Sequence, residues 1–198
     1  MRVLLIYCHP VEGSYCSALR DRTLQTLQSS GHEVRLIDLY QEGFDPVLSA
    51  LERERYLSDT SANVRGVQAH VDALRWAEGM AFVYPTWFYG APAMLKGWLE
   101  RVWLPGVAFN IALNKGDTAR PGMQHIRWLC CVTTSGSPWW WIKLVGDPGR
   151  KVFTRGLRAL FAPRCKVQWL QLYSMNNIND AARQRFLQQV ERRLASVR

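Results

Sequence analysis

The sequence predicts an α/β protein in which helices cover both faces of a parallel sheet. Along the 198 residues, short apolar runs that are typical of strands alternate five times with segments whose apolar residues recur at helical spacing. The first run, Val3–Cys8, is apolar throughout, as expected for a strand buried on both faces. No internal repeat or low-complexity linker interrupts the series, so we expect residues 1–198 to form one domain.

The first third of the chain alternates strands and helices at a regular pace. The first strand precedes an expected helix over 16–30, which Gly31 ends because glycine accepts a left-handed backbone. A second strand is expected at Val34–Leu39. Residues 40–50 contain glycine and proline and predict a loop, and 49–58 are expected to form a short polar helix.

The middle of the chain is expected to add a long helix, a strand and a further helix. Residues 62–77 carry one apolar stripe with spacings of 3, 4 and 3, which indicates a single amphipathic helix. The stripe consists of Val64, Val67, Val71 and Leu74. Gly79–Tyr84 predicts the third strand, stopped by Pro85, and 92–103 predict a helix with Pro92 in its first turn.

The second half of the chain completes the predicted sheet. Two segments rich in glycine and proline, 105–124 and 135–149, predict irregular structure. The other elements are the strand Ile126–Thr134, a helix over 150–162, the strand Lys166–Tyr173 and a closing helix over 179–197. Right-handed crossovers between five parallel strands favour the order 2-1-3-4-5, a flavodoxin-like three-layer sandwich. Ligands of such sheets bind beside the carboxyl ends of the strands, which points to the loops after the first, third and fourth strands.

Charge and cysteine content argue against several classes of protein. The net charge is +9, yet residues 1–149 carry equal numbers of basic and acidic residues, so the excess lies in residues 150–198. This asymmetry argues against a uniformly basic nucleic-acid-binding surface. Five cysteines without a CxxC pair and four isolated histidines indicate reduced thiols, no metal site and a cytoplasmic protein. No apolar run reaches the ~18 residues of a membrane span, and the N-terminal run is too short for a signal peptide.

The loop after the first strand is a candidate phosphate site. Ser14 and Ser17 stand where a helix is expected to begin, and helix N-termini bind phosphate through free N–H groups and hydroxyls. Alternatively, Ser14 serves only as an N-cap. The loop has neither GxGxxG nor GxxxxGK(S/T), which excludes a dinucleotide-binding fingerprint and a P-loop. Cys8 is expected to be a buried strand residue, since no arginine closes the loop as in a thiol phosphatase.

Aromatic and small polar residues follow the third and fourth strands. Three consecutive aromatics, Trp87, Phe88 and Tyr89, cannot all point into one core, so at least one is expected to face the crevice and suit a flat ring. A core or subunit-contact cluster is the alternative. Residues 133–136 offer hydroxyls and backbone amides that a ligand can approach closely. The tryptophans expected around this site are Trp87, Trp98, Trp103, Trp139, Trp140 and Trp141, six of the nine in the chain.

One segment resembles the signature of the NAD(P)H:quinone oxidoreductase family of flavodoxin-like flavoproteins: PTWFYGAPAMLKGWLERV, residues 85–102. The HPxxxS pattern at 9–14 and TTSG at 133–136 resemble the two other flavin-binding segments of that family. The resemblance spans roughly residues 1–175 and implies a single flavodoxin-like domain. It also implies a flavin cofactor, FMN or FAD, with NAD(P)H as electron donor.

The resemblance assigns each loop a part of the flavin. The flavin phosphate is expected to contact His9, Ser14, Tyr15 and Cys16. The isoalloxazine ring is expected to contact Pro85, Thr86, Trp87, Phe88 and Tyr89. The polar edge of the ring is expected to contact Thr133, Thr134, Ser135 and Gly136. The animal enzymes use a Tyr and a His beyond this loop, but here Trp139, Trp140 and Trp141 occupy that stretch and are the expected substrate-binding residues.

The implied function is an NAD(P)H dehydrogenase (quinone)-type oxidoreductase. It would transfer two electrons as hydride, by ping-pong kinetics, to quinones or similar flat acceptors. Family members are commonly homodimers, and 105–124 with Trp103 are the candidate contact. The basic residues nearest the site are candidates to contact the phosphates of NAD(P)H or of an FAD adenylate: Arg150, Lys151, Arg155 and Arg158. The alternative for the basic C-terminal quarter is a solvated face of the closing helix, formed by Arg183, Arg185, Arg192 and Arg193.

Three other functions are alternatives to this one. A regulatory flavoprotein subunit would bind an acidic partner, such as a transporter, through the basic C-terminal quarter. An electron-carrier flavodoxin is disfavoured because carriers usually present an acidic face. A nucleic-acid-binding module is disfavoured because no basic residues interleave with the loop aromatics.

Overall fold

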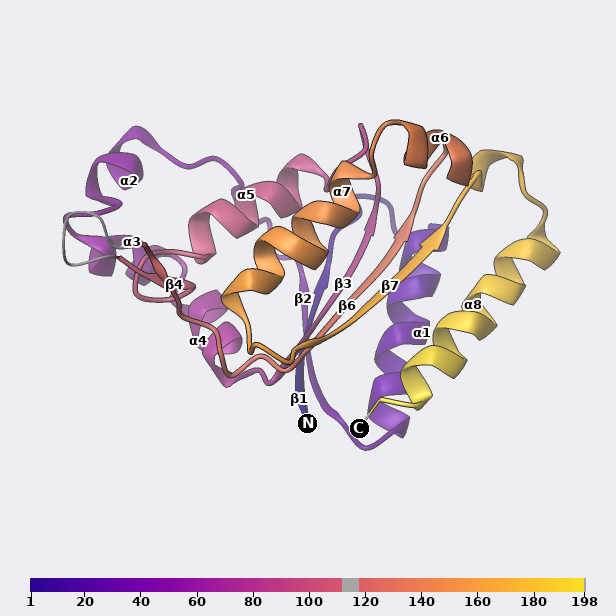
Figure 1. Cartoon of the computed structure of the whole chain (residues 1–198), viewed down its shortest axis with the longest axis horizontal. Helices are drawn as coiled ribbons and strands as arrows, with labels where there is room; N and C mark the ends of the chain where they lie inside the picture. Colours follow the sequence, from indigo (N-terminus) through magenta and orange to yellow (C-terminus); the bar gives the residue numbers. More distant parts are fainter. Residues whose placement is uncertain (112–117, 198) are drawn as a thin grey trace.

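A five-stranded parallel sheet forms the centre of the computed structural model, which describes residues 1–111 and 118–197 (Figure 1). The strand order is β2-β1-β3-β6-β7, which confirms the flavodoxin-like order predicted from the sequence. The strands are β1 (Arg2–Tyr7), β2 (Glu33–Asp38), β3 (Gly79–Pro85), β6 (Trp128–Thr134) and β7 (Lys166–Leu172). Every residue of β3 and β6 is buried, and this explains why their sequences are nearly continuous apolar runs.

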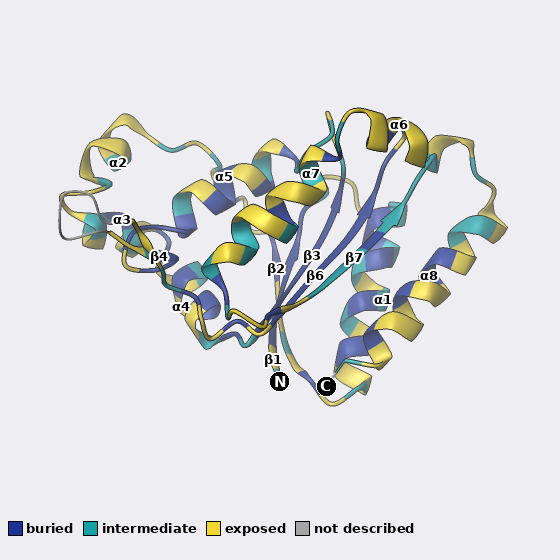
Figure 2. Cartoon of the chain, viewed as in Figure 1, coloured by how far each residue is buried: buried dark blue, intermediate teal, exposed yellow. Residues whose placement is uncertain are grey.

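Helices cover both faces of the sheet, and each face has its own core. Helices α1 (Tyr15–Ser29) and α8 (Asp180–Ala195) lie side by side on one face. The other face is covered by α4 (Gln68–Trp76), α5 (Ala93–Val102) and a helical segment that begins with α7 (Pro148–Lys151). The strands and the inner sides of these helices are buried, whereas the outer sides are exposed (Figure 2). No helix in the described part of the chain has both the length and the apolar character needed to cross a bilayer.

The cysteines lie inside these cores. All five have free thiols and are buried. Adjacent Cys130 and Cys131 belong to the cores on opposite faces of the sheet, because successive strand residues point in opposite directions. Burial raises the pKa of Cys130 to about 12, so its thiol stays protonated at neutral pH.

The single helix expected over 62–77 is in fact two, so that prediction was wrong. Helix α3 (Thr60–Gly66) ends before α4 begins, and Val67 between them has φ −131° and ψ 27°. Gly66 favours this break because glycine is a poor helix former. Val67 is nevertheless buried, so the predicted apolar stripe still faces the core.

The segment 135–149, expected to be a loop, contains the short helix α6 (Trp139–Leu144). Pro138 precedes this helix, and its carbonyl accepts a hydrogen bond from the Ile142 amide at 3.2 Å. No glycine or proline interrupts the residues from Trp139 until Gly146, so the first helical turns can form. The loop prediction relied on the flanking breakers and was wrong for these six residues.

The helix expected over 150–162 begins earlier and is irregular. Pro148 occupies the first position of α7, where proline is well tolerated. The segment continues as a π-helical turn, Val152–Gly156, and a 3-10 turn, Leu157–Leu160. The periodicity of the sequence does not reveal this change of helix type.

The remaining elements are short. Helix α2 (Ala50–Arg55) confirms the helix expected within 49–58, and Ser49 and Glu52 form a capping box at its start. Within 105–124, β4 (Phe109–Asn110) pairs antiparallel with β5 (Arg120–Pro121), whereas 112–117 lie outside the described residues. A 3-10 turn, Met175–Asn177, follows β7.

Two tryptophans expected around the ligand site instead belong to the core, so that prediction was wrong. Helix α5 turns Trp98 toward the sheet, where the side chain is fully buried, and Trp103 is also buried. Their rings pack edge to face with centroids 6.4 Å apart. The Trp98 Nε1–H donates to His70 Nδ1 at 3.3 Å. Helical spacing places Trp98 on the same inward side as Leu95 and Val102.

Candidate functional site

The loops after β1, β3 and β6 meet at the edge of the sheet where these strands end, called here the carboxyl edge. The Thr86 amide donates to the Thr134 carbonyl at 2.7 Å, and the hydroxyls of Thr86 and Thr133 lie 2.9 Å apart. These contacts join the loop after β3 to the end of strand β6. The rings of His9 and Trp87, with centroids 6.3 Å apart, bring the loop after β1 against the loop after β3. The fold therefore brings the three predicted segments together.

In the loop after β1, Ser14 caps helix α1. The Ser14 Oγ accepts from the Ser17 amide at 3.2 Å, and the Ser17 hydroxyl donates to the Ser14 carbonyl at 2.6 Å. Ser14 is thus the N-cap of α1. The amides of Tyr15 and Cys16 lie in the first turn of a 15-residue helix, where no intrahelical acceptor exists. The helix start therefore directs N–H groups at this edge.

The side chains of Tyr15 and Cys16 point away from the edge. The Tyr15 hydroxyl donates to the Arg183 carbonyl of α8 at 2.7 Å. Cys16 is buried in the core, and this burial raises the pKa of its thiol to about 12. Both residues thus offer backbone groups to a ligand, and the Cys16 thiol is neither exposed nor ionised at neutral pH.

The loop after β3 makes a tight turn of strained aromatic residues. The Trp87 amide donates to the Gly90 carbonyl at 3.1 Å, and the Gly90 amide donates to the Trp87 carbonyl at 2.9 Å. Between them, Phe88 and Tyr89 have φ values of 46° and 64°, a left-handed conformation that bulky residues rarely adopt. Turns of this kind normally contain Asn or Gly. Phe88 is fully exposed and Trp87 is 42% exposed, so exposed aromatic rings and strain coincide.

The tryptophans of α6 pack beside this turn. The Trp141 Nε1–H donates to the Tyr89 hydroxyl at 2.8 Å. The rings of Trp140 and Trp141 meet edge to face, with centroids 5.6 Å apart. Trp139 and Trp140 are 58% and 60% exposed. The structure therefore brings Trp141 into contact with the aromatic residues that follow β3, whereas Trp139 and Trp140 are exposed to solvent.

The predicted segment 133–136 comprises the end of β6 and the start of the loop that follows, and three of its four residues are buried. Thr133, Thr134 and Ser135 are all buried, and the Ser135 amide donates to the Leu172 carbonyl at 2.8 Å. The Ser135 hydroxyl donates to the Ser137 carbonyl at 3.1 Å. Their polar groups thus connect β6 to its neighbours. Gly136 is the exposed member of the predicted segment.

Residues that the sequence reasoning did not assign to the flavin lie beneath the aromatic turn. A Cβ at Gly149 would lie 2.6 Å from the Tyr89 carbonyl oxygen, so α7 approaches the turn closely only because glycine is there. Asp147 is buried with φ 51°, and its Oδ2 accepts from Lys143 Nζ at 2.6 Å. The local sequence Gly-Asp-Pro-Gly indicates a turn but not its contact with residues some 60 positions earlier.

Comparison with known proteins places this geometry in a family. Residues 1–197 match a family model described as a flavodoxin-like fold. The chain belongs to this family. The flavodoxin-like chain is 28% identical over 131 residues to the uncharacterized NAD(P)H oxidoreductase YcaK of Escherichia coli strain K12, covering 66% of this chain and 64% of the relative. It is 30% identical over 153 residues to NAD(P)H dehydrogenase (quinone) 1 of Cavia porcellus, covering 69% of this chain and 54% of that protein.

A solved structure extends the likeness over nearly the whole flavodoxin-like chain. The structure of a putative quinone reductase from Klebsiella pneumoniae superposes with a TM-score of 0.81 at 26% identity. The match covers 98% of this chain and 83% of that protein. The aligned regions of the curated relatives above span between about half and two thirds of their own lengths.

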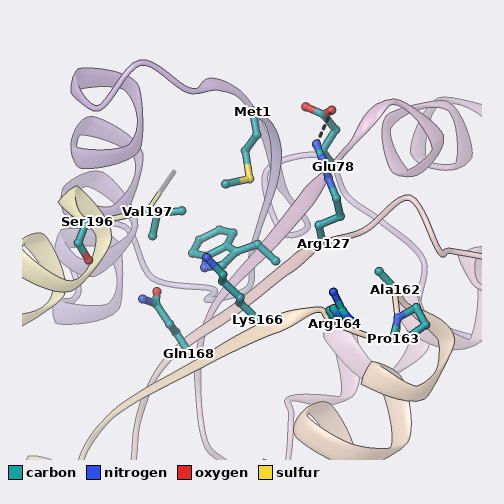
Figure 3. A pocket seen from close by; sticks show the side chains of 11 residues that line it. Met1, Glu78, Arg127, Ala162, Pro163, Arg164, Lys166, Gln168, Ser196 and Val197 are labelled. Carbon is teal, nitrogen blue, oxygen red and sulfur yellow. Dashed lines mark hydrogen bonds and ion pairs between the residues drawn. The ribbon is translucent and has the colours of Figure 1, made fainter.

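A hollow lined by described residues lies elsewhere, at the opposite edge of the sheet, called here the amino edge (Figure 3). Its volume is about 850 Å³. Arg127 and Glu78 face each other on its wall, with Arg127 Nη2 donating to Glu78 Oε1 at 3.0 Å. The predicted site residues are absent from this hollow. Two hollows lined by described residues at the carboxyl edge are smaller, with volumes of about 360 Å³ and about 10 Å³.

Proposed function

We propose that this chain is a flavin-dependent NAD(P)H oxidoreductase that transfers hydride by ping-pong kinetics to quinones or similar flat acceptors. The observation that carries the proposal is the strained turn with exposed Trp87 and Phe88, which lies against His9 in the loop that leads into α1. Strain of this kind persists where the surrounding structure enforces it, commonly at ligand sites. The matched relatives are named as NAD(P)H oxidoreductases, which favours an enzyme over a regulatory subunit.

The residues at the carboxyl edge fit a flavin. The first-turn amides of α1, with Ser14 and His9, suit the phosphate, because a helix start favours negative charge. Trp87, with Pro85 and Thr86 behind it, suits one side of the isoalloxazine ring. Gly136 offers an exposed backbone to the polar edge of the ring, held in place by the buried residues before it.

The protein's part in the reaction is to bind, orient and exclude water. A bound flavin supplies the capacity to take a hydride from a nicotinamide and pass it to an acceptor. The 2.8 Å hydrogen bond between Trp141 and Tyr89 fixes their two side-chain rings relative to each other beside the space proposed for the flavin ring and the nicotinamide, called here the slot. Because Tyr89 Oη accepts this bond, its own proton remains available to an oxygen of the acceptor. The thiols of Cys8 and Cys16 take no part, since burial raises both pKa values to about 12.

We also propose that two copies of the chain complete the slot. Neither of the two hollows described at the carboxyl edge is lined by a residue of the loop after β1, so neither encloses a whole flavin together with that loop. Large apolar side chains are exposed beside them, namely Phe88, Trp139, Trp140, Leu144, Val145 and Val152. Such a patch favours association. The earlier candidate Trp103 does not provide this surface because it is buried, and of the other candidate segment, 105–124, residues 112–117 lie outside the described residues.

Sedimentation equilibrium tests the dimer. The wild type is expected to be dimeric, and Trp140→Ser combined with Leu144→Ser is expected to shift it toward monomer. Leu57→Ser, at an exposed apolar residue of another region, is the matched control. A monomeric wild type that binds flavin fully would contradict the proposal.

The buried free thiols support a reducing compartment, and we propose that the protein is cytoplasmic.

Steady-state kinetics test the reaction. Protein loaded with FMN or FAD is expected to oxidise NADH or NADPH with menadione as acceptor, and double-reciprocal plots are expected to be parallel. Turnover that requires both substrates bound at once would contradict ping-pong transfer. Flavin binding without turnover would instead support the carrier or regulatory alternatives.

A further inference from the structure

A second hollow lies next to the aromatic turn and is lined by positive charge. Its volume is about 360 Å³, and we call its lining the basic pocket: Lys143, Gly146, Asp147, Arg150, Lys151, Thr154 and Arg155. Asp147 and Arg150 also line the small cavity that reaches Thr86 and Tyr89. The basic pocket therefore adjoins the slot proposed for the flavin ring and nicotinamide.

The charges of the basic pocket are not balanced within the described residues. Lys143 is neutralised by Asp147, its partner at 2.6 Å. No described Asp or Glu lies within ion-pair distance of Arg150, Lys151 or Arg155. The Thr154 hydroxyl donates to the Arg150 carbonyl at 2.8 Å, which fixes the turn that carries these side chains. The pocket thus presents three cations from one helical segment to a common space.

We propose that the basic pocket binds phosphate of the nicotinamide dinucleotide and favours NADPH over NADH through the 2′-phosphate. This inference rests on the proposed function. A phosphate monoester carries close to two negative charges at neutral pH, and arginine binds its oxygens in a bidentate fork. The dinucleotide pyrophosphate, common to both donors, carries about two further charges. The three unpaired cations of the basic pocket match the greater negative charge of NADPH. Arg150 lines both the basic pocket and the small cavity that reaches Tyr89, so one dinucleotide could place its phosphate in the pocket and its nicotinamide beside Tyr89.

Calorimetric titration tests binding without any turnover. The probes are 2′,5′-ADP, 5′-AMP, which lacks only the 2′-phosphate, and inorganic phosphate. We expect 2′,5′-ADP to bind at least about tenfold more tightly than 5′-AMP, a difference of about 1.4 kcal/mol. Arg155→Gln and Arg150→Gln are expected to abolish this ratio. Arg185→Gln, at an exposed arginine of α8, is the matched control and is expected to preserve it.

Kinetics provide the second arm. Arg155→Gln is expected to raise KM for NADPH by about tenfold more than KM for NADH. Equal increases for the two donors would show that the pocket holds only the shared pyrophosphate and would overturn the inference. Inorganic phosphate binding as tightly as 2′,5′-ADP would also overturn it. If 2′,5′-ADP binds selectively but no turnover occurs, the proposed function fails and the phosphate site stands.

Discussion

The carboxyl and amino edges of the same sheet differ in backbone strain and in exposed aromatic surface. Four non-glycine residues among 1–111 and 118–197 have positive φ: Phe88, Tyr89, Asp147 and Ser174. All four follow β3, α6 or β7 at the carboxyl edge (Figure 1). In the part of the chain that the structure describes, the amino edge has neither strained backbone of this kind nor exposed aromatic rings. It has the larger of the hollows given above, and its Glu78 is paired with Arg127 (Figure 3). The site proposed for the flavin therefore coincides with strained backbone and exposed aromatic rings, and not with the hollow of larger volume.

The difference follows from how a parallel α/β sheet is built. Loops at the carboxyl edge lead from strands into helix N-termini, so N–H groups point at whatever binds there. Loops at the amino edge lead from helix C-termini into strands and mainly close the core. We therefore expect substitutions at the amino edge to change stability, and substitutions at the carboxyl edge to change ligand binding.

The largest expected effect is at the amino edge. Trp128 is 3% exposed, and Trp128→Ala is expected to lower the free energy of unfolding by about 3–5 kcal/mol through the lost packing. Trp128→Phe should cost less and remain folded. In urea unfolding, Arg127→Ala is the control and should cost about 1 kcal/mol or less, since an exposed ion pair contributes little. If Trp128→Phe folds normally but loses flavin or turnover, the division between the two edges is wrong.

An intermediate effect is expected beneath the aromatic turn. In Gly149→Ala the new Cβ would meet the Tyr89 carbonyl, so the turn must shift, at a cost of about 1–3 kcal/mol. Turnover should fall by more than this stability loss explains, because the ring positions move. Gly156→Ala adds a Cβ with no atom within 4 Å and is the matched control. Equal turnover in both variants would show that the position of the turn does not matter.

A smaller effect of opposite sign is expected within the turn. Phe88→Gly removes the left-handed strain and should stabilise the flavin-free protein by about 0.5–1 kcal/mol, after the entropy of glycine is counted. Phe88→Ala removes the same ring but keeps the strain. In thermal unfolding, the Phe88→Gly variant should have a higher Tm than the Phe88→Ala variant. The reverse order would mean that the turn stores no strain.

The smallest effect concerns pH and the amino edge. Burial, with the neighbouring N-terminal ammonium, lowers the pKa of His32, whose Nε2 donates to the Val197 carbonyl at 3.2 Å. The unfolded chain then binds the proton more readily, so this stability is complete above the ordinary pKa of about 6.5 and falls as the pH drops below it. Urea midpoints across this range should show a shallower loss for His32→Gln. If the urea midpoint depends on pH in the same way in His32→Gln and in the wild type, His32 does not contribute to the pH dependence of stability.

The sequence was sufficient for features with a local or fold-level cause. Alternation of apolar runs and helical stripes predicted the strand order, and that order placed the three loops at one edge. The sequence did not predict the position of a side chain where contacts with residues far away in the chain determine it. Trp98 and Trp103 follow a loop of exposed aromatic residues, yet helix α5 and its C-cap place both side chains in the core. The closeness of Gly149 to Tyr89 depends on how α7 packs, which no local pattern contains.

The most direct test of the central claim is the flavin content of the purified full chain. After incubation with FMN or FAD, the wild type and Trp128→Phe are expected to retain flavin, identified by mass spectrometry after heat release. Trp87→Ala is expected to bind at least about tenfold more weakly while its unfolding free energy changes by less than about 1 kcal/mol, since Trp87 is 42% exposed. A colourless wild type that takes up neither flavin, or equal loss of flavin in Trp87→Ala and Trp128→Phe, would contradict the assignment of the cofactor to the carboxyl edge.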